Sequence, residues 1–282
     1  MDDERRWRSY SSGARMARER MAREAPLDSR ALEAVEASDV VVVRGAYDRV
    51  ELVLDVLGMP YTPILASHLG QVRLRPEQLL VINCPGNLHG SHLGAVRGFV
   101  TAGGSLFTTD WALHHVLEQA FPGYVAFNRR PTRDEVVRIE VLDHSNPFLR
   151  GVADPGEDPL WWLEGSSYPI RVLDPSVRVL IRSGELGARY GEAAVAVLFR
   201  HGLGEVFHMI SHYYLQRTEL RDARHRSSAA EYAASKGIAP DAEMDGLTAG
   251  EVESATSSAR LLANLLAAKK RREQERRGAR DA

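Results

Sequence analysis

The sequence predicts an α/β protein built as a three-layer sandwich, with helices on both faces of a mainly parallel sheet. Residues 79–83 (LLVIN) and 105–108 (SLFT) are apolar runs, each followed by a polar turn and a helix-like segment. A third run, residues 39–43 (DVVVV), is β-branched without a polar face, which is typical of a strand covered on both sides. Strands that alternate with helices in this way favour a parallel sheet.

Helix-like segments between these runs complete the alternation. Residues 47–57 are amphipathic and end at a glycine, and residues 90–102 carry apolar side chains on one face before a Gly-Gly turn. Beyond Phe121 the chain consists of short β-like runs separated by Pro and Gly, which would extend the sheet or add a flap beside it. We predict a further helix at residues 112–119 and further strands at residues 61–65, 136–142, 161–164, 167–172, 178–182, 194–199 and 205–210.

Both ends of the chain are predicted to add helices outside this sheet. Residues 1–24 have apolar side chains at helical spacing among Arg and Glu, and a second helix is predicted at residues 29–37. Residues 218–250 indicate loop or marginal helix, whereas residues 249–277 indicate a long helix with a leucine stripe. The predicted division is an N-terminal helical extension at 1–29, an α/β domain at 30–216, and a loop and C-terminal helix with a basic tail at 217–282.

Composition restricts the class of protein. The 282 residues are 44% apolar and 26% charged, as in soluble globular proteins, and one cysteine excludes an intrachain disulfide. Apolar runs fall short of the ~20 residues that span a bilayer, and residues 1–24 lack the apolar core of a signal peptide. We therefore expect a cytoplasmic protein that does not enter a membrane. The basic run at 269–277 is expected to be a solvated helix end, and nucleic acid is a disfavoured partner because base-stacking aromatic residues are absent nearby.

Several pieces of the sequence occur in an order that resembles a known superfamily. One strand is followed by Arg44-Gly45, a second by Pro85-Gly86, and Ala-Gly-Gly leads into a third strand with a sharp turn at Asp110. The later pieces are HSNPFLRGV at residues 144–152 and HGLGEVFHMISH at residues 201–212. Together they resemble the class I glutamine amidotransferase-like superfamily, including its PfpI and ThuA-like branches, over residues 39–214. The resemblance implies a flavodoxin-like fold with its pocket at the carboxyl edge of the sheet.

The resemblance also implies roles for two residues. The superfamily carries a nucleophilic cysteine on the strained turn where this chain has Asp110. His212 matches the general base, and Tyr214 stands where the matching acid is expected. Acyl transfer needs both a nucleophile and a base, so this triad is incomplete. From the residues alone we favour Asp110 as the N-cap of the following helix over a catalytic role.

Cys84 is a second candidate nucleophile, at the end of the preceding strand. Its activation would need a cation, a histidine or a helix N-terminus nearby. The favoured alternative is a small buried side chain, because the superfamily carries no nucleophile on this strand. Asp48 and Glu51, which follow the first strand, could add polar groups to the same pocket or lie on the solvent face of a helix.

Histidines gather near the predicted carboxyl edge. His89 and His92 are three residues apart, so both could lie on one helical face and, with Asp110, offer three ligands to a divalent metal. No His-Glu-x-x-His or Cys-x-x-Cys pattern accompanies them, and the favoured alternative is partly exposed loop and helix histidines. We therefore expect no cofactor, with a divalent metal as the alternative.

Loop residues at the ends of the predicted strands are candidates for binding a small-molecule ligand. They are Gly45, Tyr47, Gly86, Asn87 and Trp111. The first hypothesis for function is a non-catalytic, degenerate amidotransferase-like domain that binds a small molecule or a protein partner, or forms a homo-oligomer. The second is a ThuA-like hydrolase of a small carbonyl, glycoside or amide substrate that uses Asp110 with His212, or a His-bound metal. The sequence leaves open whether the chain is an enzyme.

Overall fold

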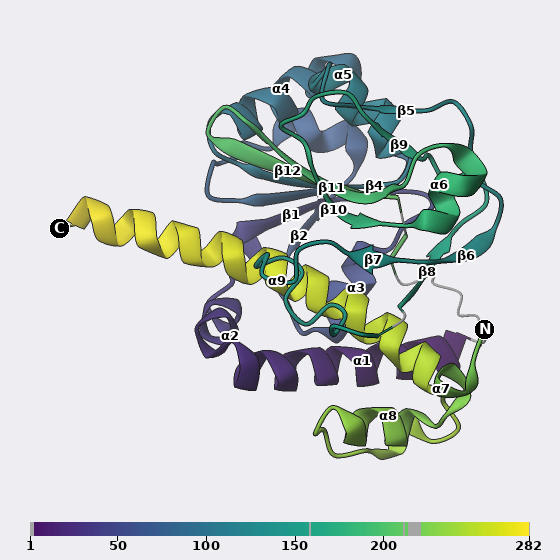
Figure 1. Cartoon of the computed structure of the whole chain (residues 1–282). Helices are drawn as coiled ribbons and strands as arrows, with labels where there is room; N and C mark the ends of the chain where they lie inside the picture. Colours follow the sequence, from purple (N-terminus) through teal and green to yellow (C-terminus); the bar gives the residue numbers. More distant parts are fainter. Residues whose placement is uncertain (1–2, 158, 211, 214–220, 282) are drawn as a thin grey trace.

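The computed structural model describes residues 3–157, 159–210, 212–213 and 221–281. Its strands are β1 (Val40–Val43), β2 (Thr62–Ile64), β3 (Leu79–Ile82), β4 (Ser105–Thr109), β5 (Val125–Phe127), β6 (Glu135–Arg138), β7 (Glu140–Val141), β8 (Leu160–Leu163), β9 (Ile170–Val172), β10 (Arg178–Arg182), β11 (Ala194–His201) and β12 (Gly204–Met209). The main sheet has the order β2-β1-β3-β4-β12-β11-β10-β7, with β9 on β11 and β5 on β9 (Figure 1). Strands from β2 to β12 pair in parallel, and β11, β10 and β7 continue antiparallel.

The predicted centre of the sheet is confirmed. β1 pairs with β3 in parallel, with Val41 opposite Leu80, and β3 pairs with β4, with Leu80 opposite Leu106. Every residue of these strands is buried, as expected where helices cover both faces. The fold class is therefore the predicted one, a three-layer α/β sandwich with a mainly parallel sheet.

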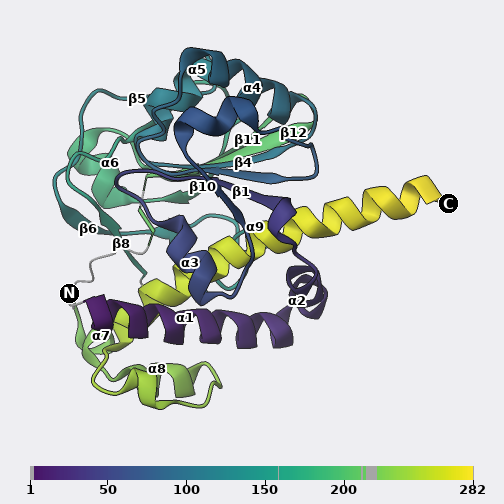
Figure 2. The ribbon, with the colours of Figure 1, turned by 180° about the vertical axis from the view of Figure 1, so that it is seen from behind.

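Helices form a layer on each face of the sheet (Figures 1 and 2). On one face lie α4 (Gly90–Thr101) and α5 (Glu118–Ala120), and on the other lie α3 (Val50–Val56) and the long α9 (Ala249–Asp281). Helix α4 buries Val96, Phe99 and Val100, whose spacing puts them on one face. The polar turns at the carboxyl ends of the strands are thus held between two packed layers.

The helices at the two ends of the chain pack on each other and share a core with the sheet. α1 (Asp3–Glu24) lies along α9, and α2 (Pro26–Glu33) also contacts it. The backbones approach so closely at Gly13 that a Cβ there would lie 2.7 Å from the carbonyl carbon of Ala255. Arg5 adds a two-pronged ion pair to Glu251, at 2.6 and 2.7 Å. Buried residues of α1, α2, α9 and the sheet form one hydrophobic cluster.

Several predicted elements differ in detail. The second helix is α2, which ends at Glu33 and not at residue 37. The predicted strand 136–142 is divided, because β6 pairs with β8 in a separate small sheet while β7 pairs with β10. The predicted helix 112–119 begins with a π-helix at Leu113–Leu117, a form that is often found beside functional sites.

The segment predicted as loop or marginal helix, residues 218–250, contains three short helices in its described part. They are α7 (Ala223–Arg226), α8 (Ala229–Ser235) and a 3-10 turn, η4 (Ala242–Met244); residues 218–220 lie outside the described residues. Helices α7 and α8 pack against α9, and Met16 of α1 joins apolar residues of α8, of the segment after it and of the start of α9 in a second cluster. None of the described helices is both long and apolar enough to cross a membrane.

Candidate functional site

Asp110 occupies the sharp turn between β4 and the π-helix, with a φ of 39° that non-glycine residues rarely adopt. Its N–H donates to the carbonyl of Met209 at 2.9 Å, which continues the β4–β12 pairing into the turn. Its carboxylate accepts hydrogen bonds from the backbone N–H of Tyr168 at 2.8 Å and from the Ser167 hydroxyl at 3.1 Å. The prediction that Asp110 caps the following helix is therefore wrong, because the partners of its side chain come from the chain before β9.

Cys84 lies at the end of β3, one strand away from Asp110. Its backbone N–H donates to the Thr109 hydroxyl at 3.0 Å, and the peptide bond to Pro85 is cis. The loop after β1 packs directly on this turn, since a Cβ on Gly45 would lie 2.0 Å from the Cys84 carbonyl oxygen. The adjacent parallel strands β3 and β4 thus bring the Cys84 thiol and the Asp110 carboxylate to the same edge of the sheet.

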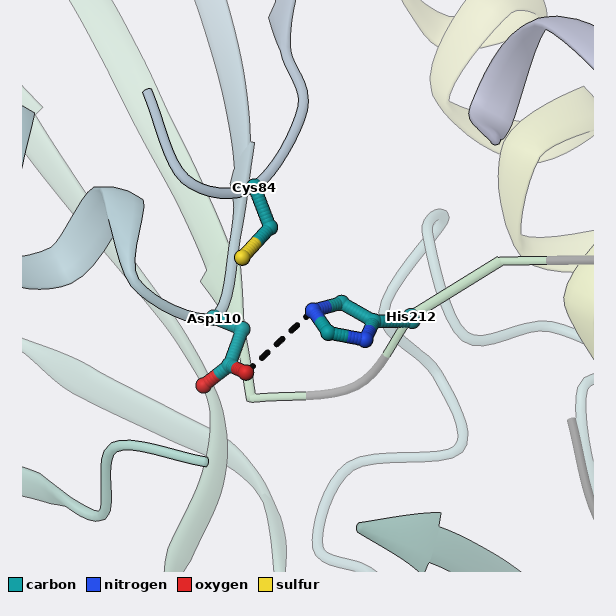
Figure 3. A group of neighbouring side chains, drawn as sticks. All are labelled: Cys84, Asp110 and His212. Atoms are coloured by element: carbon teal, nitrogen blue, oxygen red, sulfur yellow. Dashed lines mark ion pairs between the residues drawn. The ribbon is translucent and has the colours of Figure 1, made fainter. Parts of the chain in front are cut away.

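His212, just after β12, completes the group (Figure 3). Its Nε2 lies 3.2 Å from Oδ2 of Asp110, so these two side chains are within hydrogen-bond reach. The Cys84 sulfur, an Asp110 oxygen and a His212 nitrogen all lie within 4.8 Å of one another. The exposed fractions of the three residues are 0%, 1% and 3%. The group is therefore buried and closely packed.

Two further carboxylates surround His212. Glu164, just after β8, pairs with Nδ1, so the two ring nitrogens face different acids. Asp48 is buried after β1 and accepts hydrogen bonds from the N–H groups of Tyr213 and Arg49, both at 2.7 Å. The resemblance implies the acid at position 214, which lies outside the described residues. The signal that could have found Glu164 is a lone acid at the end of the apolar run LWWL.

The charges in this group are strongly coupled. Burial would lower the pKa of His212, but hydrogen bonds to Asp110, Cys84 and Glu164, together with the charge of Asp48, raise it well above its usual range. Burial raises the pKa of Asp110 and of the Cys84 thiol, and His212 opposes both shifts. Burial also raises the pKa of Asp48 to about 6. One imidazole therefore stabilises several buried acids.

The structure does not bring His89 and His92 to Asp110. His89 caps α4, with Nδ1 2.8 Å from the Ser91 hydroxyl, and its ring centroid is 5.8 Å from that of His92. Among the described residues, the one group of three His, Cys, Asp or Glu side chains with closely spaced ligand atoms is Cys84, Asp110 and His212. The structure therefore does not assemble the predicted set of His89, His92 and Asp110, and of these three only Asp110 belongs to the close group.

The residues predicted to bind a ligand fall into three kinds. Tyr47 and Trp111 border the site in an aromatic row: Tyr47 meets Trp111 edge-on at 5.3 Å, and Trp111 stacks on Tyr168 at 5.4 Å. The two glycines pack instead, because a Cβ on Gly86 would lie 2.9 Å from that of Ala112, as Gly45 packs on Cys84. The remaining candidate, Asn87, is an exposed loop residue.

Comparisons with known proteins identify relatives by structure alone. No family model matches the chain. No curated protein matches it. A glutamine amidotransferase from Thermotoga maritima is 11% identical with a TM-score of 0.48, over 84% of this chain and 98% of that one. A putative ThuA-like protein from Bacteroides uniformis is also 11% identical, with a TM-score of 0.45 over 63% of this chain and 83% of that one.

A larger enzyme matches over part of its length. An exo-β-1,4-mannosidase from an Opitutaceae bacterium is 10% identical with a TM-score of 0.40, over 64% of this chain but only 32% of the mannosidase. The neighbours include proteins with the amidotransferase and ThuA-like folds that the sequence resembles. The similarity concerns the fold alone.

Proposed function

We propose that the chain is a metal-dependent hydrolase whose reaction centre is formed by Cys84, Asp110 and His212. The observation that carries the proposal is that a thiol, a carboxylate and an imidazole from three separate segments place ligand atoms within 4.8 Å of one another in a buried site. Sulfur, nitrogen and oxygen donors suit Zn²⁺ and related divalent transition metals. Three protein ligands leave a position for water, as in catalytic zinc sites.

The spacing of the donors supports a shared ion. Zinc binds sulfur at ~2.3 Å and nitrogen or oxygen at ~2.0–2.2 Å, so donors on one tetrahedral ion lie roughly 3–4 Å apart. The 3.2 Å between Nε2 of His212 and Oδ2 of Asp110 is in this range. Small side-chain movements would bring all three donors to bonding distance.

Each of the three candidate ligands is also oriented by a further hydrogen bond, as metal ligands usually are. Glu164 pairs with Nδ1 of His212, which leaves Nε2 directed at the centre. Ser167 and the backbone N–H of Tyr168 orient the Asp110 carboxylate, and the backbone N–H of Trp111 interacts with the Cys84 sulfur. A carboxylate–histidine pair pointing at an ion is a recurrent feature of zinc centres.

The local charge favours a metal ion over a cysteine nucleophile. Reactive cysteines sit among positive groups that stabilise the thiolate. Here the pKa of the Cys84 thiol is raised, because burial and the charge of Asp110 outweigh the opposing effect of His212. A thiolate would add another anion to this buried site, whereas a divalent cation would offset the carboxylates already there.

A bound ion would supply an activated water or polarise the bond to be cleaved. The chain's own residues position and enclose the reactants: Glu164 fixes the orientation of His212, and Trp111 and Tyr47 border the centre with aromatic surface. The substrate class remains the small carbonyl, glycoside or amide compound that the sequence resemblance implies.

The test begins with metal content and hydrolysis by the full chain. We expect purified protein to bind close to one Zn²⁺ or Co²⁺ per chain, with a cobalt–thiolate absorption band that reports the sulfur ligand. Cys84→Ser, Asp110→Asn and His212→Gln should each lose this binding while the fold remains by circular dichroism. Glu164→Gln should weaken metal affinity about 10–100-fold, because it removes support from His212 without removing a ligand.

The matched control is the double variant His89→Gln, His92→Gln, which removes the two histidines predicted from the sequence. It should keep the metal and any hydrolysis of a substrate panel of small amides, esters and aryl glycosides. Loss of metal in this control, with retention in Cys84→Ser, would move the site to α4 and overturn the proposal. Binding of no transition metal by the wild-type chain would also overturn it.

A second function is favoured by one observation, the near-complete burial of Cys84, Asp110 and His212. Burial of this degree also suits a non-catalytic domain that binds a small molecule or a protein partner, or forms a homo-oligomer, as the first hypothesis from the sequence has it. Stoichiometric metal without hydrolysis of the panel, together with a native mass above that of one chain, would favour this function.

A further inference from the structure

A cleft of about 1050 Å³ lies at the opposite edge of the sheet from Asp110. Its walls are the segments that lead into β1, β3 and β4, the hairpin between β11 and β12, and the C-terminal part of α9. Parallel strands begin at this edge and end at the edge that carries Cys84 and Asp110. The cleft is therefore separate from the proposed reaction centre.

Lys269 of α9 lines this cleft although it is only 7% exposed. Its ammonium donates to the carbonyl oxygens of Pro76 at 2.6 Å and Gly103 at 3.2 Å. Within the described part of the chain, no carboxylate forms an ion pair with it. Buried ammonium groups are normally paired with an anion. An anion bound in the cleft would therefore stabilise the Lys269 ammonium.

The neighbours of Lys269 in the sequence do have carboxylate partners. Lys270 pairs with Asp39 at 2.8 Å, and Arg271 pairs with Asp28 at 2.8 Å. Residues 269–273 of the predicted solvated basic tail are thus docked on the protein, whereas residues 274–278 are exposed as predicted. Lys269 differs from these neighbours in being more buried and in having no ion-pair partner among the described residues.

Other cations converge on the same cleft. Arg75, Arg200 and Arg276 line it, and none of them has an ion pair with the carboxylates that the structure describes. Burial lowers the pKa of Lys269 to about 8, and the positive charges of Arg272 and Arg276 add to this effect. The charges of Glu205 and Glu77 oppose this shift, and Glu205 is itself paired with Arg272.

We propose that this cleft binds a compact anion of the phosphate class, with the Lys269 ammonium as its central contact and guanidinium groups of Arg75, Arg200 and Arg276 around it. Guanidinium groups match phosphate oxygens in geometry and charge. The volume suits a small-molecule ligand. A long nucleic acid fits less well, because the described lining of the cleft has no aromatic side chain on which bases could stack.

The test measures binding of inorganic phosphate and pyrophosphate to the full chain by calorimetry and by thermal shift at constant ionic strength. We expect saturable binding that Lys269→Met weakens at least about tenfold, because a charge-assisted contact is lost. Arg276→Gln should also weaken it. The matched control Arg271→Gln removes a cation that faces Asp28 and should leave affinity within about twofold. Asp110→Asn should bind the anions normally, which separates this site from the proposed metal centre.

The stability of Lys269→Met distinguishes an anion site from a purely structural lysine. With the buried charge removed, the ligand-free variant should be as stable as the wild type or more so, yet gain nothing from phosphate. Equal phosphate affinity of Lys269→Met and wild type would overturn the proposal. Tighter binding of a single-stranded oligonucleotide than of pyrophosphate, lost in Lys269→Met, would also overturn it and assign the cleft to nucleic acid.

Discussion

Gly45 controls the position of Cys84 through backbone contact. A methyl group at this position would lie 2.0 Å from the Cys84 carbonyl oxygen and 2.8 Å from Cβ of Asn83, so the two turns would have to separate. We expect Gly45→Ala to lower the free energy of unfolding by about 1–3 kcal/mol and to weaken metal binding. Urea unfolding and metal titration measure the two effects. Gly90→Ala is the control, since its Cβ would meet no atom within 4 Å. It should neither lower the free energy of unfolding nor weaken metal binding.

His208 provides a test of pH dependence away from the ligands. It is fully buried in β12, with Nδ1 2.8 Å from the Thr108 hydroxyl, and burial lowers its pKa to about 3. Between pH 3 and 6.5 the unfolded chain binds a proton at this residue that the folded chain does not, so stability falls as pH falls through this window.

The wild type should therefore lose about 1.5 kcal/mol between pH 6.5 and pH 5 through His208 alone. His208→Gln should remove this part of the loss, which urea unfolding of both proteins at the two pH values would measure. Equal acid sensitivity of the two proteins would contradict the neutral, buried imidazole.

At the residue scale, the sequence predicted Asp110 and His212 as site residues but not the side chains that surround them. Asp110 and His212 follow strands whose apolar runs are readable, and parallel strands bring their ends to one edge. Glu164 could not be assigned, because it arrives from β8 of the small second sheet, whose position depends on tertiary packing. The prediction that Asp110 caps the following helix was wrong for the same reason. Ser167 and Tyr168 come from a distant segment and bind the Asp110 carboxylate instead.

At the element scale, the contact between α1 and α9 depends on Gly13. Alanine usually favours a helix over glycine by up to ~1 kcal/mol. Here the added Cβ would lie 2.7 Å from the backbone of Ala255 and Thr256, so the steric effect should prevail. We expect Gly13→Ala to lower the melting temperature and the free energy of unfolding.

The matched control is Gly94→Ala on α4, where a Cβ would meet open space. It should raise the free energy of unfolding by about 0.5–1 kcal/mol, because only helix propensity changes. Opposite signs for the two Gly→Ala changes are the expected result of thermal or urea unfolding. A stabilised Gly13→Ala variant would mean that the two helices are not in close contact.

Periodicity located these helices but not their partners. The leucine stripe indicated that one side of α9 is buried, yet the structure buries most of its circumference between residues 252 and 267. The reason is that α9 lies between the sheet side of the molecule and α1, with α2 and α8 also against it. The elements that pack against α9 are determined by how the layers assemble, and the apolar periodicity of the helix does not identify them.

At the scale of the whole molecule, the pairing of α1 with α9 has a consequence for synthesis of the chain. Arg5 pairs with Glu251, 246 positions later, so α1 leaves the ribosome well before the helix against which it packs. At 5–20 residues per second, α1 would wait roughly 10–50 seconds with its apolar face uncovered. Until α9 is made, the nascent chain therefore presents the amphipathic α1 with its apolar face uncovered, and a chaperone that recognises such faces has a long period in which to bind it.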